Sequence, residues 1–184
     1  MENGRNSRLT QAGFTLIEAI VAMTVAAVLL CVAVPALGGM LARQRLVTAQ
    51  IELVAALQHA RSAAITGRQR TLFCPSANGT QCADDTHWER GWAIGRYRTT
   101  NADQLDGPPS QVHGSYPKLI IMSTAGRKRV RFQPDGTTGG SNVTFVLCRS
   151  GHQEDALAIT VSNMGRVANK KPADDEAGRC AAGG

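Results

Sequence analysis

Residues 14–37, FTLIEAIVAMTVAAVLLCVAVPAL, form an apolar run whose only polar members are Thr15, Glu18 and Thr24. A helix rises about 1.5 Å per residue, so a run of this length spans the roughly 30 Å of hydrocarbon in a bilayer. The run therefore predicts a transmembrane helix over residues 14–38. A charged side chain within such a span costs at least about 2.5–3.5 kcal/mol, and an intramembrane carboxylate usually marks a functional position.

Residues 1–13 precede the run and carry Arg5 and Arg8 against Glu2. Positive charge beside a span favours retention of that end in the cytoplasm, and a large domain beyond the span is translocated largely regardless of its charge. We therefore expect a cytoplasmic N-terminus. The alternative is a secretory signal cleaved after Ala36, but the run exceeds the roughly 7–15 apolar residues of such signals. That alternative also leaves the carboxylate unexplained.

The hexapeptide GFTLIE at residues 13–18 resembles the leader junction of type IV prepilins and type II secretion pseudopilins. The resemblance implies that prepilin peptidase cleaves between Gly13 and Phe14 and that the new Phe14 amine is N-methylated. It also implies that residues 1–13 are a leader and that the partners are other pilins or pseudopilins. The expected location is the bacterial inner membrane, with a single span, a periplasmic head and incorporation into a pilus or pseudopilus.

The physical role of Glu18 follows from this junction. Cleavage after Gly13 would create a positively charged amine at Phe14, four residues from the carboxylate. An uncompensated carboxylate in a dry filament core is strongly destabilising, so it needs a paired charge. The Phe14 amine of an adjacent subunit is the expected partner, which makes Glu18 an assembly residue. The alternative is that Glu18 reaches the membrane lipid headgroups, because it lies near the end of the span.

Residues 39–66 show the periodicity of an amphipathic helix that packs on a domain. Arg61 lies toward the apolar face and is expected to find a buried partner, and Gly67 is expected to cap the helix. The expected buried face carries Val47, Ile51, Val54, Leu57 and Ile65.

After Gly67 the pattern changes to short strands separated by Gly, Pro, Asn and Asp. Six segments fit: RTLF, GWAIGRYR, KLIIMS, RKRVRFQ, NVTFVLC and ALAITVS. Residues 99–117 predict a long exposed loop, and residues 168–184 predict a polar tail ordered only through Cys180. The sequence therefore predicts an α+β fold, and the resemblance at residues 13–18 implies that it is of the type IV pilin kind. In it a long N-terminal helix, transmembrane and then amphipathic, packs on a head of antiparallel β-sheet formed by residues 67–184.

Three segments of the head resemble the GspH/FimT family: HWERGWAIG, FQPDGTTGGSNVTFVLC and AITVSNMGRVANKK. With HARSAAI in the amphipathic helix, they extend the resemblance over nearly the whole chain. The resemblance implies a FimT-like minor pilin that takes part in type IV pilus assembly. The alternative is a GspH-like minor pseudopilin of a type II protein secretion system, which has the same fold.

Four of the five cysteines lie in the head, an even number that suits an oxidising compartment. Four cysteines allow three pairings. The turn-forming residues between Cys74 and Cys82 favour a bridge between these two, which leaves Cys148 and Cys180 as the second pair. A zinc site is the rival interpretation, although the spacing contains no CxxC pair.

The formal net charge is +6 and the isoelectric point about 9.4, which suits an anionic partner such as DNA or lipid. Some FimT-like pilins bind DNA through a C-terminal Gly-Arg-x-Arg element, whose second arginine is replaced here by Ala168. The candidate DNA-binding residues are Arg149, Arg166, Lys170, Lys171 and Arg179. A bridge between Cys148 and Cys180 is expected to bring Arg149 and Arg179 near the other three residues. The alternative is a solvated basic tail, and RKRVR at residues 127–131 is a second basic segment.

The sequence contains no motif of an enzyme. The four histidines lack the HExxH spacing of a zinc protease, and neither GxSxG nor a P-loop occurs. Asp84 and Asp85 supply too few ligands for calcium. We therefore expect neither catalysis nor a metal or cofactor.

Overall fold

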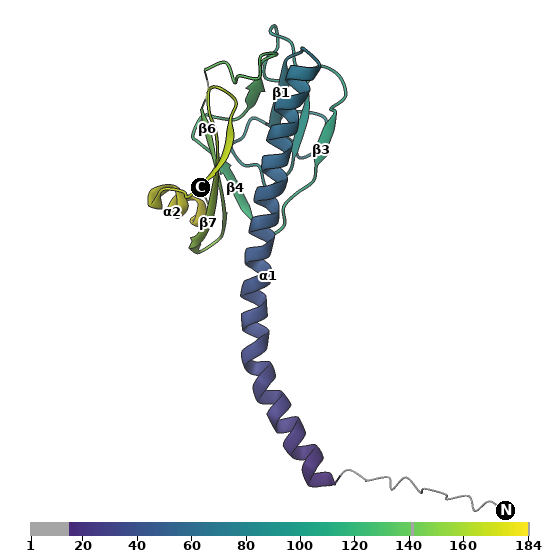
Figure 1. Cartoon of the computed structure of the whole chain (residues 1–184), viewed down its shortest axis with the longest axis vertical. Helices are drawn as coiled ribbons and strands as arrows, with labels where there is room; N and C mark the ends of the chain where they lie inside the picture. The colour runs from purple at the N-terminus through teal and green to yellow at the C-terminus, as the bar shows by residue number, and fades with distance from the viewer. Residues whose placement is uncertain (1–14, 141, 184) are drawn as a thin grey trace, which may run out of the picture. The chain divides into compact units, whose positions relative to one another are not determined.

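The computed structural model describes residues 15–140 and 142–183. The chain divides into two compact units, Met1–Ala42 and Arg43–Gly184. Its class is α+β, as the sequence predicts. Helix α1 (Leu16–Thr66) comes first, strands β1 to β8 follow, and a short helix α2 (Asp174–Ala181) lies near the C-terminus (Figure 1).

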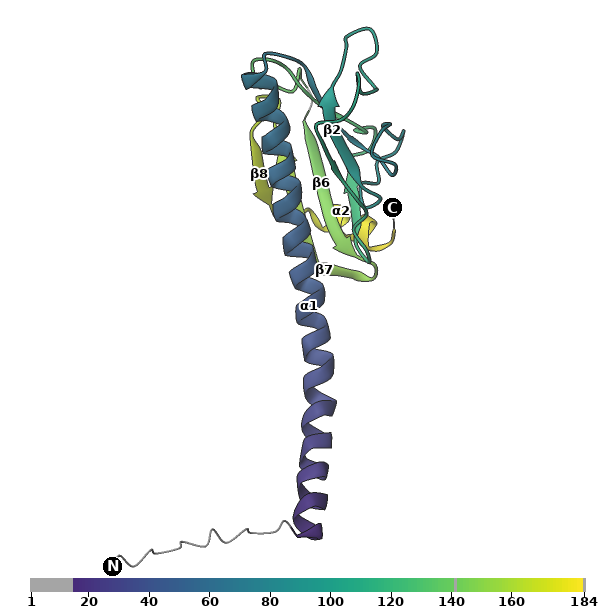
Figure 2. The same cartoon turned by 90° about the vertical axis from the view of Figure 1, so that its right-hand side faces the viewer.

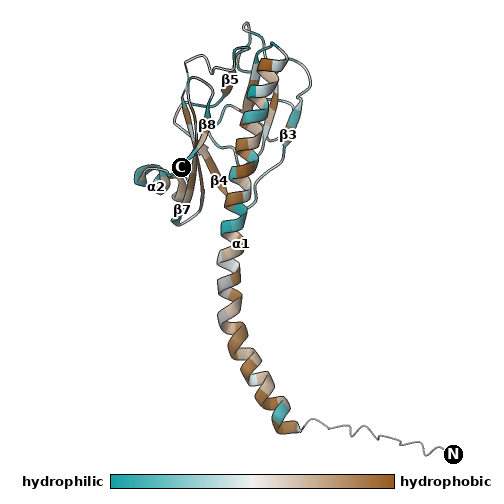
Figure 3. Cartoon of the chain, in the orientation of Figure 1, coloured by the Kyte–Doolittle hydropathy of each residue, from teal (hydrophilic) through white to brown (hydrophobic). Residues whose placement is uncertain are grey.

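In the first unit, the helical residues are those of α1 from Leu16 to Ala42. Most of them are hydrophobic (Figure 3), and large apolar side chains such as those of Leu16 and Met23 are exposed. In the part of the chain that the structure describes, no helix is both long and apolar enough to cross a bilayer. The transmembrane helix over residues 14–38 stays a prediction.

The second unit contains two four-stranded antiparallel sheets (Figure 2). The first has the order β3-β2-β1-β5, with β1 Thr71–Pro75, β2 Trp92–Arg96, β3 Gln111–His113 and β5 Val130–Phe132. The second has the order β4-β6-β7-β8, with β4 Ile120–Ser123, β6 Val143–Arg149, β7 His152–Val161 and β8 Val167–Lys170. Antiparallel pairing needs only short connections, which is why β6, β7 and β8 follow one another directly.

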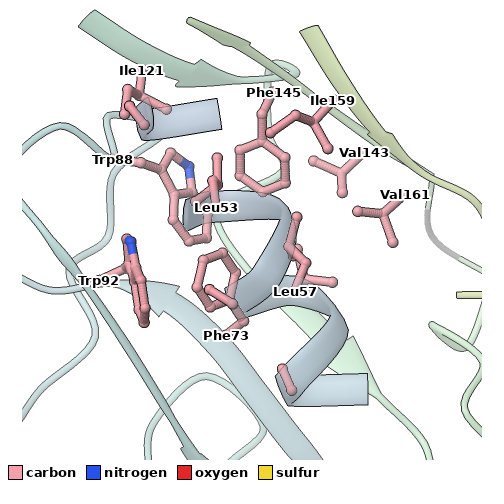
Figure 4. Close-up of a cluster of buried hydrophobic side chains, with 14 of the residues drawn as sticks. Leu53, Leu57, Phe73, Trp88, Trp92, Ile121, Val143, Phe145, Ile159 and Val161 are labelled. Carbon is pink, nitrogen blue, oxygen red and sulfur yellow. The ribbon is translucent and has the colours of Figure 1, made fainter. Parts of the chain in front are cut away.

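The hydrophobic core of this unit is formed by α1 and one face of each sheet (Figure 4). Phe73 of β1 stacks on Trp88 with ring centroids 4.9 Å apart, and Phe145 of β6 meets Trp88 edge to face, also at 4.9 Å. Pairs of this geometry add about 0.5–1.5 kcal/mol to the free energy gained from burying the rings. Leu53 and Leu57 of α1 belong to the same buried cluster. The core therefore ties both sheets to the helix.

The buried face of α1 differs from the predicted one. Of the five predicted apolar side chains only Leu57 is fully buried, whereas Ile51 is 63% and Ile65 is 44% exposed. The observed buried stripe includes four alanines at helical spacing: Ala49, Ala56, Ala60 and Ala64. Small side chains let a helix backbone approach the sheets closely, whereas the prediction gave more weight to large apolar residues.

Helix α1 ends at Thr66, as predicted, but the left-handed residue of its cap lies one position after Gly67. Arg68, with φ 46°, is the residue in the left-handed region. Its N–H donates to Ile65 O at 3.3 Å, and the N–H of Gln69 donates to Ala64 O at 3.2 Å. These two bonds form a Schellman motif, in which Arg68 takes the position predicted for Gly67.

The six predicted strands are confirmed, but the loop and the tail are not. Strand β3 lies within the predicted loop 99–117. Its His113 pairs with Trp92 of the neighbouring strand β2. Strand β8 and helix α2 lie within the predicted tail 168–184. Helix α2 carries acidic side chains in its first turn, and Glu176 accepts a bond from the N–H of Ala173. The prediction missed these local helix signals.

Both disulfide pairs favoured by the sequence are present. Cys74 and Cys82 are bridged with Cα atoms 5.5 Å apart, and Cys148 and Cys180 with Cα atoms 6.1 Å apart. The second bridge joins α2 to β6, where Ala177 and Cys180 pack on Val146. Helix α2 thereby covers part of the second sheet, on the face away from α1.

The two bridges should differ in their effect on the free energy of unfolding. They span 8 and 32 residues, for which the chain-entropy estimate is about 2.5 and about 3.7 kcal/mol. We therefore expect a Cys148→Ala/Cys180→Ala variant to lose about 1 kcal/mol more than a Cys74→Ala/Cys82→Ala variant. Urea unfolding followed by the fluorescence of the two tryptophans checks this. A smaller loss for the long-range pair would contradict it.

A column of three rings joins the first sheet to α1. His113 lies between Trp92 and Tyr116, with ring centroids 5.3 and 4.3 Å away. The indole Nε1 of Trp92 donates to the Tyr116 hydroxyl at 3.0 Å, and Glu52 of α1 lies 3.4 Å from Nε2 of His113. Burial raises the pKa of Tyr116 to about 12. Burial therefore favours the neutral form of Tyr116.

Because the pKa of Tyr116 is raised in the folded chain, the free energy of unfolding should fall in alkaline solution. Below pH 10.0 the Tyr116 hydroxyl is neutral in the folded and the unfolded chain, and between pH 10.0 and about 12 only the unfolded chain releases its proton. The free energy of unfolding should therefore decrease as pH rises through this interval. Tyr116→Phe should make the decrease smaller, because it removes the hydroxyl that titrates. Urea unfolding at a series of alkaline pH values measures this decrease in the free energy of unfolding. Identical profiles for Tyr116→Phe and the wild type would contradict the assignment of the decrease to Tyr116.

Candidate functional site

The predicted processing and assembly residues lie at the start of the chain. Gly13 and Phe14 lie outside the described residues. Glu18 is exposed in the first turn of α1, where its N–H donates to Thr15 Oγ1 at 3.3 Å. Among the residues that the structure describes, its carboxylate has no ion-pair partner. A negative charge suits the positive end of the helix dipole, and the side chain is open to a partner from outside the chain.

Three of the predicted basic residues flank strand β8. Arg166 lies in the turn between β7 and β8, Lys170 ends β8, and Lys171 follows it. All three side chains are exposed, and none has a carboxylate partner in the described ranges 15–140 and 142–183. At about 3.3 Å per residue, Arg166 and Lys170 are separated by about 13 Å along the strand.

The other two predicted basic residues do not join this group. Arg149 begins the turn between β6 and β7, at the opposite end of β7 from Arg166. Its guanidinium pairs with Asp155, and this hydrogen bond holds the pKa of the Asp155 carboxyl below its usual range. Arg179 pairs with Asp175 at 3.1 Å. The bridge between β6 and α2 therefore does not bring Arg149 near Arg166, and Arg149 and Arg179 already have acidic partners.

The glycine of the Gly-Arg motif has a structural role. Gly165 has φ 72°, and a Cβ on it would overlap the carbonyl oxygen of Gly136. The expected partner of Arg61 is found here, since its Nε donates to Gly136 O at 3.0 Å and its Nη2 to Met164 O at 3.2 Å. Two turns are thereby fastened to α1, beside a cavity of about 430 Å³ that Arg166 lines.

The second basic segment has partners that sequence reasoning missed. Residues 127–131 lie in the connection into β5 and in β5 itself. Asp84 accepts from Lys128 Nζ at 2.8 Å, and Asp103 pairs with Arg131. The two aspartates come from loops far away in the sequence, so no local pattern could have revealed them. In the described part of the chain, no group of three or more metal-binding side chains occurs.

Comparison with protein families gives two matches. The family described as type II transport protein GspH matches residues 49–165. The prokaryotic N-terminal methylation motif matches residues 8–34, which include the predicted junction and Glu18. No curated protein sequence matches significantly.

Three solved structures are similar to this one. The type IV minor pilin FimU of Pseudomonas aeruginosa strain PAO1 has a TM-score of 0.59 and 24% identity, over 70% of this chain and 90% of FimU. A second crystal form of FimU has a TM-score of 0.55 and 23% identity, over 67% and 90%. The minor pseudopilin EpsH from the type 2 secretion system of Vibrio cholerae has a TM-score of 0.48 and 12% identity, over 67% and 94%. The likeness to FimU supports the assignment of the fold.

Proposed function

Because this chain belongs to the type II transport protein GspH family and carries the prokaryotic N-terminal methylation motif, we propose that it is a minor pilin-like subunit. The observation that carries the proposal is the order of the two matches along one chain. The methylation motif ends at residue 34, and the GspH match begins at residue 49, within α1. A processed N-terminus is thus followed by the helix and head of a filament subunit.

The proposed course of events begins in the inner membrane. Residues 14–38 anchor the chain, residues 1–13 face the cytoplasm, and the head lies in the periplasm. Prepilin peptidase removes the leader between Gly13 and Phe14, and the Phe14 amine is methylated. The subunit then leaves the lipid and packs against other pilins, with Glu18 paired to the amine of a neighbour. The two disulfides support a periplasmic head, because such bridges persist in oxidising compartments.

Processing is tested by replacing Gly13. A Gly13→Val variant should keep its leader, since a branched side chain beside the scissile bond obstructs the peptidase. The wild type should instead begin with methylated Phe14, which mass spectrometry of the purified protein detects. Gly39→Val, in the helix with open space around it, is the matched control and should be processed normally. A Gly13→Val chain of wild-type mature mass would contradict the assigned junction.

We favour the type IV pilus over a type II secretion system as the machine that this subunit serves. The support is the basic charge of +6 and the Gly165-Arg166 motif. Deletion of the gene should then reduce surface pili and leave protein secretion unchanged. Loss of secretion with normal piliation would instead support a minor pseudopilin.

A second proposed function is DNA binding by the group around β8. Arg166, Lys170 and Lys171 are exposed cations without acidic partners among the described residues, so no carboxylate of that part of the chain competes with phosphate for them. Binding of DNA by the full chain in neutral detergent should weaken steeply with salt, because each phosphate contact releases counterions. Changing the three residues to Ala should lower both the affinity and the salt slope. Absence of binding at low salt would leave a purely structural subunit.

A further inference from the structure

A polar cavity of about 300 Å³ lies beside β5, the edge strand of the first sheet. Its lining includes four basic side chains and only two acidic ones, so positive charge is in excess. The charged residues of the lining are Arg127, Lys128, Arg129, Arg131, Asp84 and Asp103. Clefts lined by an excess of one charge concentrate ions of the opposite sign.

Strand geometry explains why the arginines gather there. In β5, Val130 and Phe132 are buried, so the period of two places Arg129 and Arg131 on the other face. Arg127 precedes the strand in a turn, where its N–H donates to Thr124 O at 2.8 Å. Three arginines and a lysine within five consecutive positions thus converge on one cavity.

Arg129 is the fixed centre of this cluster. Its side chain is only 8% exposed, which is costly for a charge unless acceptors surround it. Its Nε donates to the carbonyl oxygen of Asp103 at 2.7 Å, and its Nη1 lies 3.3 Å from Asp84 Oδ1. The guanidinium therefore holds a single orientation at the wall of the cavity.

The two carboxylates mark positions where these donors bind an oxyanion. The hydrogen bonds from Lys128 and then Arg129 hold the pKa of Asp84 below its usual range. The side chains of Asp84 and Asp103 are nevertheless 75% and 62% exposed, so water screens the attraction between these carboxylates and the basic side chains. An anion with more charge and more oxygen atoms than a carboxylate competes well for the same donors. Phosphate has both the higher charge and the additional oxygen atoms. It can accept two parallel hydrogen bonds from an arginine and a further one from the lysine.

We propose that this cavity is a phosphate-binding site, with Lys128, Arg129 and Arg131 as its donors. The phosphate comes from a small phosphorylated molecule or from the phosphodiester backbone of DNA. The inference goes beyond the filament role, and it does not depend on the basic group around β8.

The test is isothermal titration calorimetry of the full chain, in neutral detergent at low salt. It measures the affinity for inorganic pyrophosphate and, separately, for a short single-stranded oligonucleotide. Arg131→Gln should weaken binding about tenfold, the usual effect of losing one charge-assisted hydrogen bond. Asp84→Asn should tighten it by about the same factor, since a competing carboxylate is removed. Misfolding cannot produce tighter binding. Arg98→Gln removes a similarly paired surface arginine outside the cavity and should change nothing.

The two probes separate the sources of phosphate. Binding of pyrophosphate that depends on Arg131 supports a small ligand, and binding of the oligonucleotide alone that depends on Arg131 supports DNA. The site is overturned if neither probe binds the wild type, or if Asp84→Asn weakens binding. It is also overturned if the oligonucleotide alone binds and its affinity depends on Arg166, Lys170 and Lys171 but not on Arg131.

Discussion

A Glu18→Gln variant should accumulate in the membrane fraction and be nearly absent from assembled filaments. The change keeps the size of the side chain and removes its charge. In the proposed filament, the methylated Phe14 amine of the neighbouring subunit would then be buried without a counter-charge. Breaking a buried ion pair in this way costs about 3–5 kcal/mol, which corresponds to more than about a hundredfold loss of incorporation.

Immunoblots of sheared filaments and of membranes measure this effect. Thr24→Ala is the matched control, because within the described residues the Thr24 hydroxyl bonds inside its own helix, from Oγ1 to Val21 O at 2.8 Å. The control should be incorporated as the wild type is. Equal incorporation of Glu18→Gln and the wild type would refute the ion pair and favour a carboxylate that reaches the lipid headgroups.

The second large effect is expected in the turn before β8. At Gly165 an added methyl group meets two penalties, the left-handed backbone at φ 72° and overlap with Gly136 O. The first costs about 1–2 kcal/mol and the second about 1–3 kcal/mol. Gly165→Ala should therefore lower the free energy of unfolding by about 2–5 kcal/mol.

Gly151 provides a control for the backbone penalty alone. It has a nearly identical φ of 75°, and a Cβ there would have no atom within 4 Å. Gly151→Ala should cost only about 1–2 kcal/mol. Urea unfolding of both variants, followed by the fluorescence of buried Trp88 and Trp92, gives the difference. Equal losses would mean that the turns separate easily, and Gly165 would then have no special structural role.

The two halves of the Gly-Arg motif therefore have different roles. Gly165 allows two turns to approach each other and α1, which is a matter of stability. Arg166 is exposed and has no acidic partner among the described residues, so its replacement tests binding. DNA-binding assays on variants of Gly165 would confuse loss of folding with loss of binding, whereas Arg166→Ala separates them.

Local patterns in the sequence predicted the elements that depend on near neighbours. The six strands, the long helix and the α+β class follow from periods of two and 3.6 residues, which a short window of sequence contains. The turn-forming residues between Cys74 and Cys82 likewise favoured the pairing that the structure has. The junction at Gly13 and Phe14 and the role of Glu18 also come from the sequence, and they stay predictions.

Only the tertiary structure decided which surfaces meet. It buries alanines of α1 in place of Ile51 and Ile65, because close approach of helix and sheet favours small side chains. It makes β3 a strand because β2 lies beside it, and it brings Asp84 and Asp103 to the basic residues of β5. Each of these contacts joins residues far apart in the sequence. Their energy depends on a partner surface that no local pattern contains, so the sequence determined the long helix and six of the strands, and the fold determined β3 and the contacts between elements.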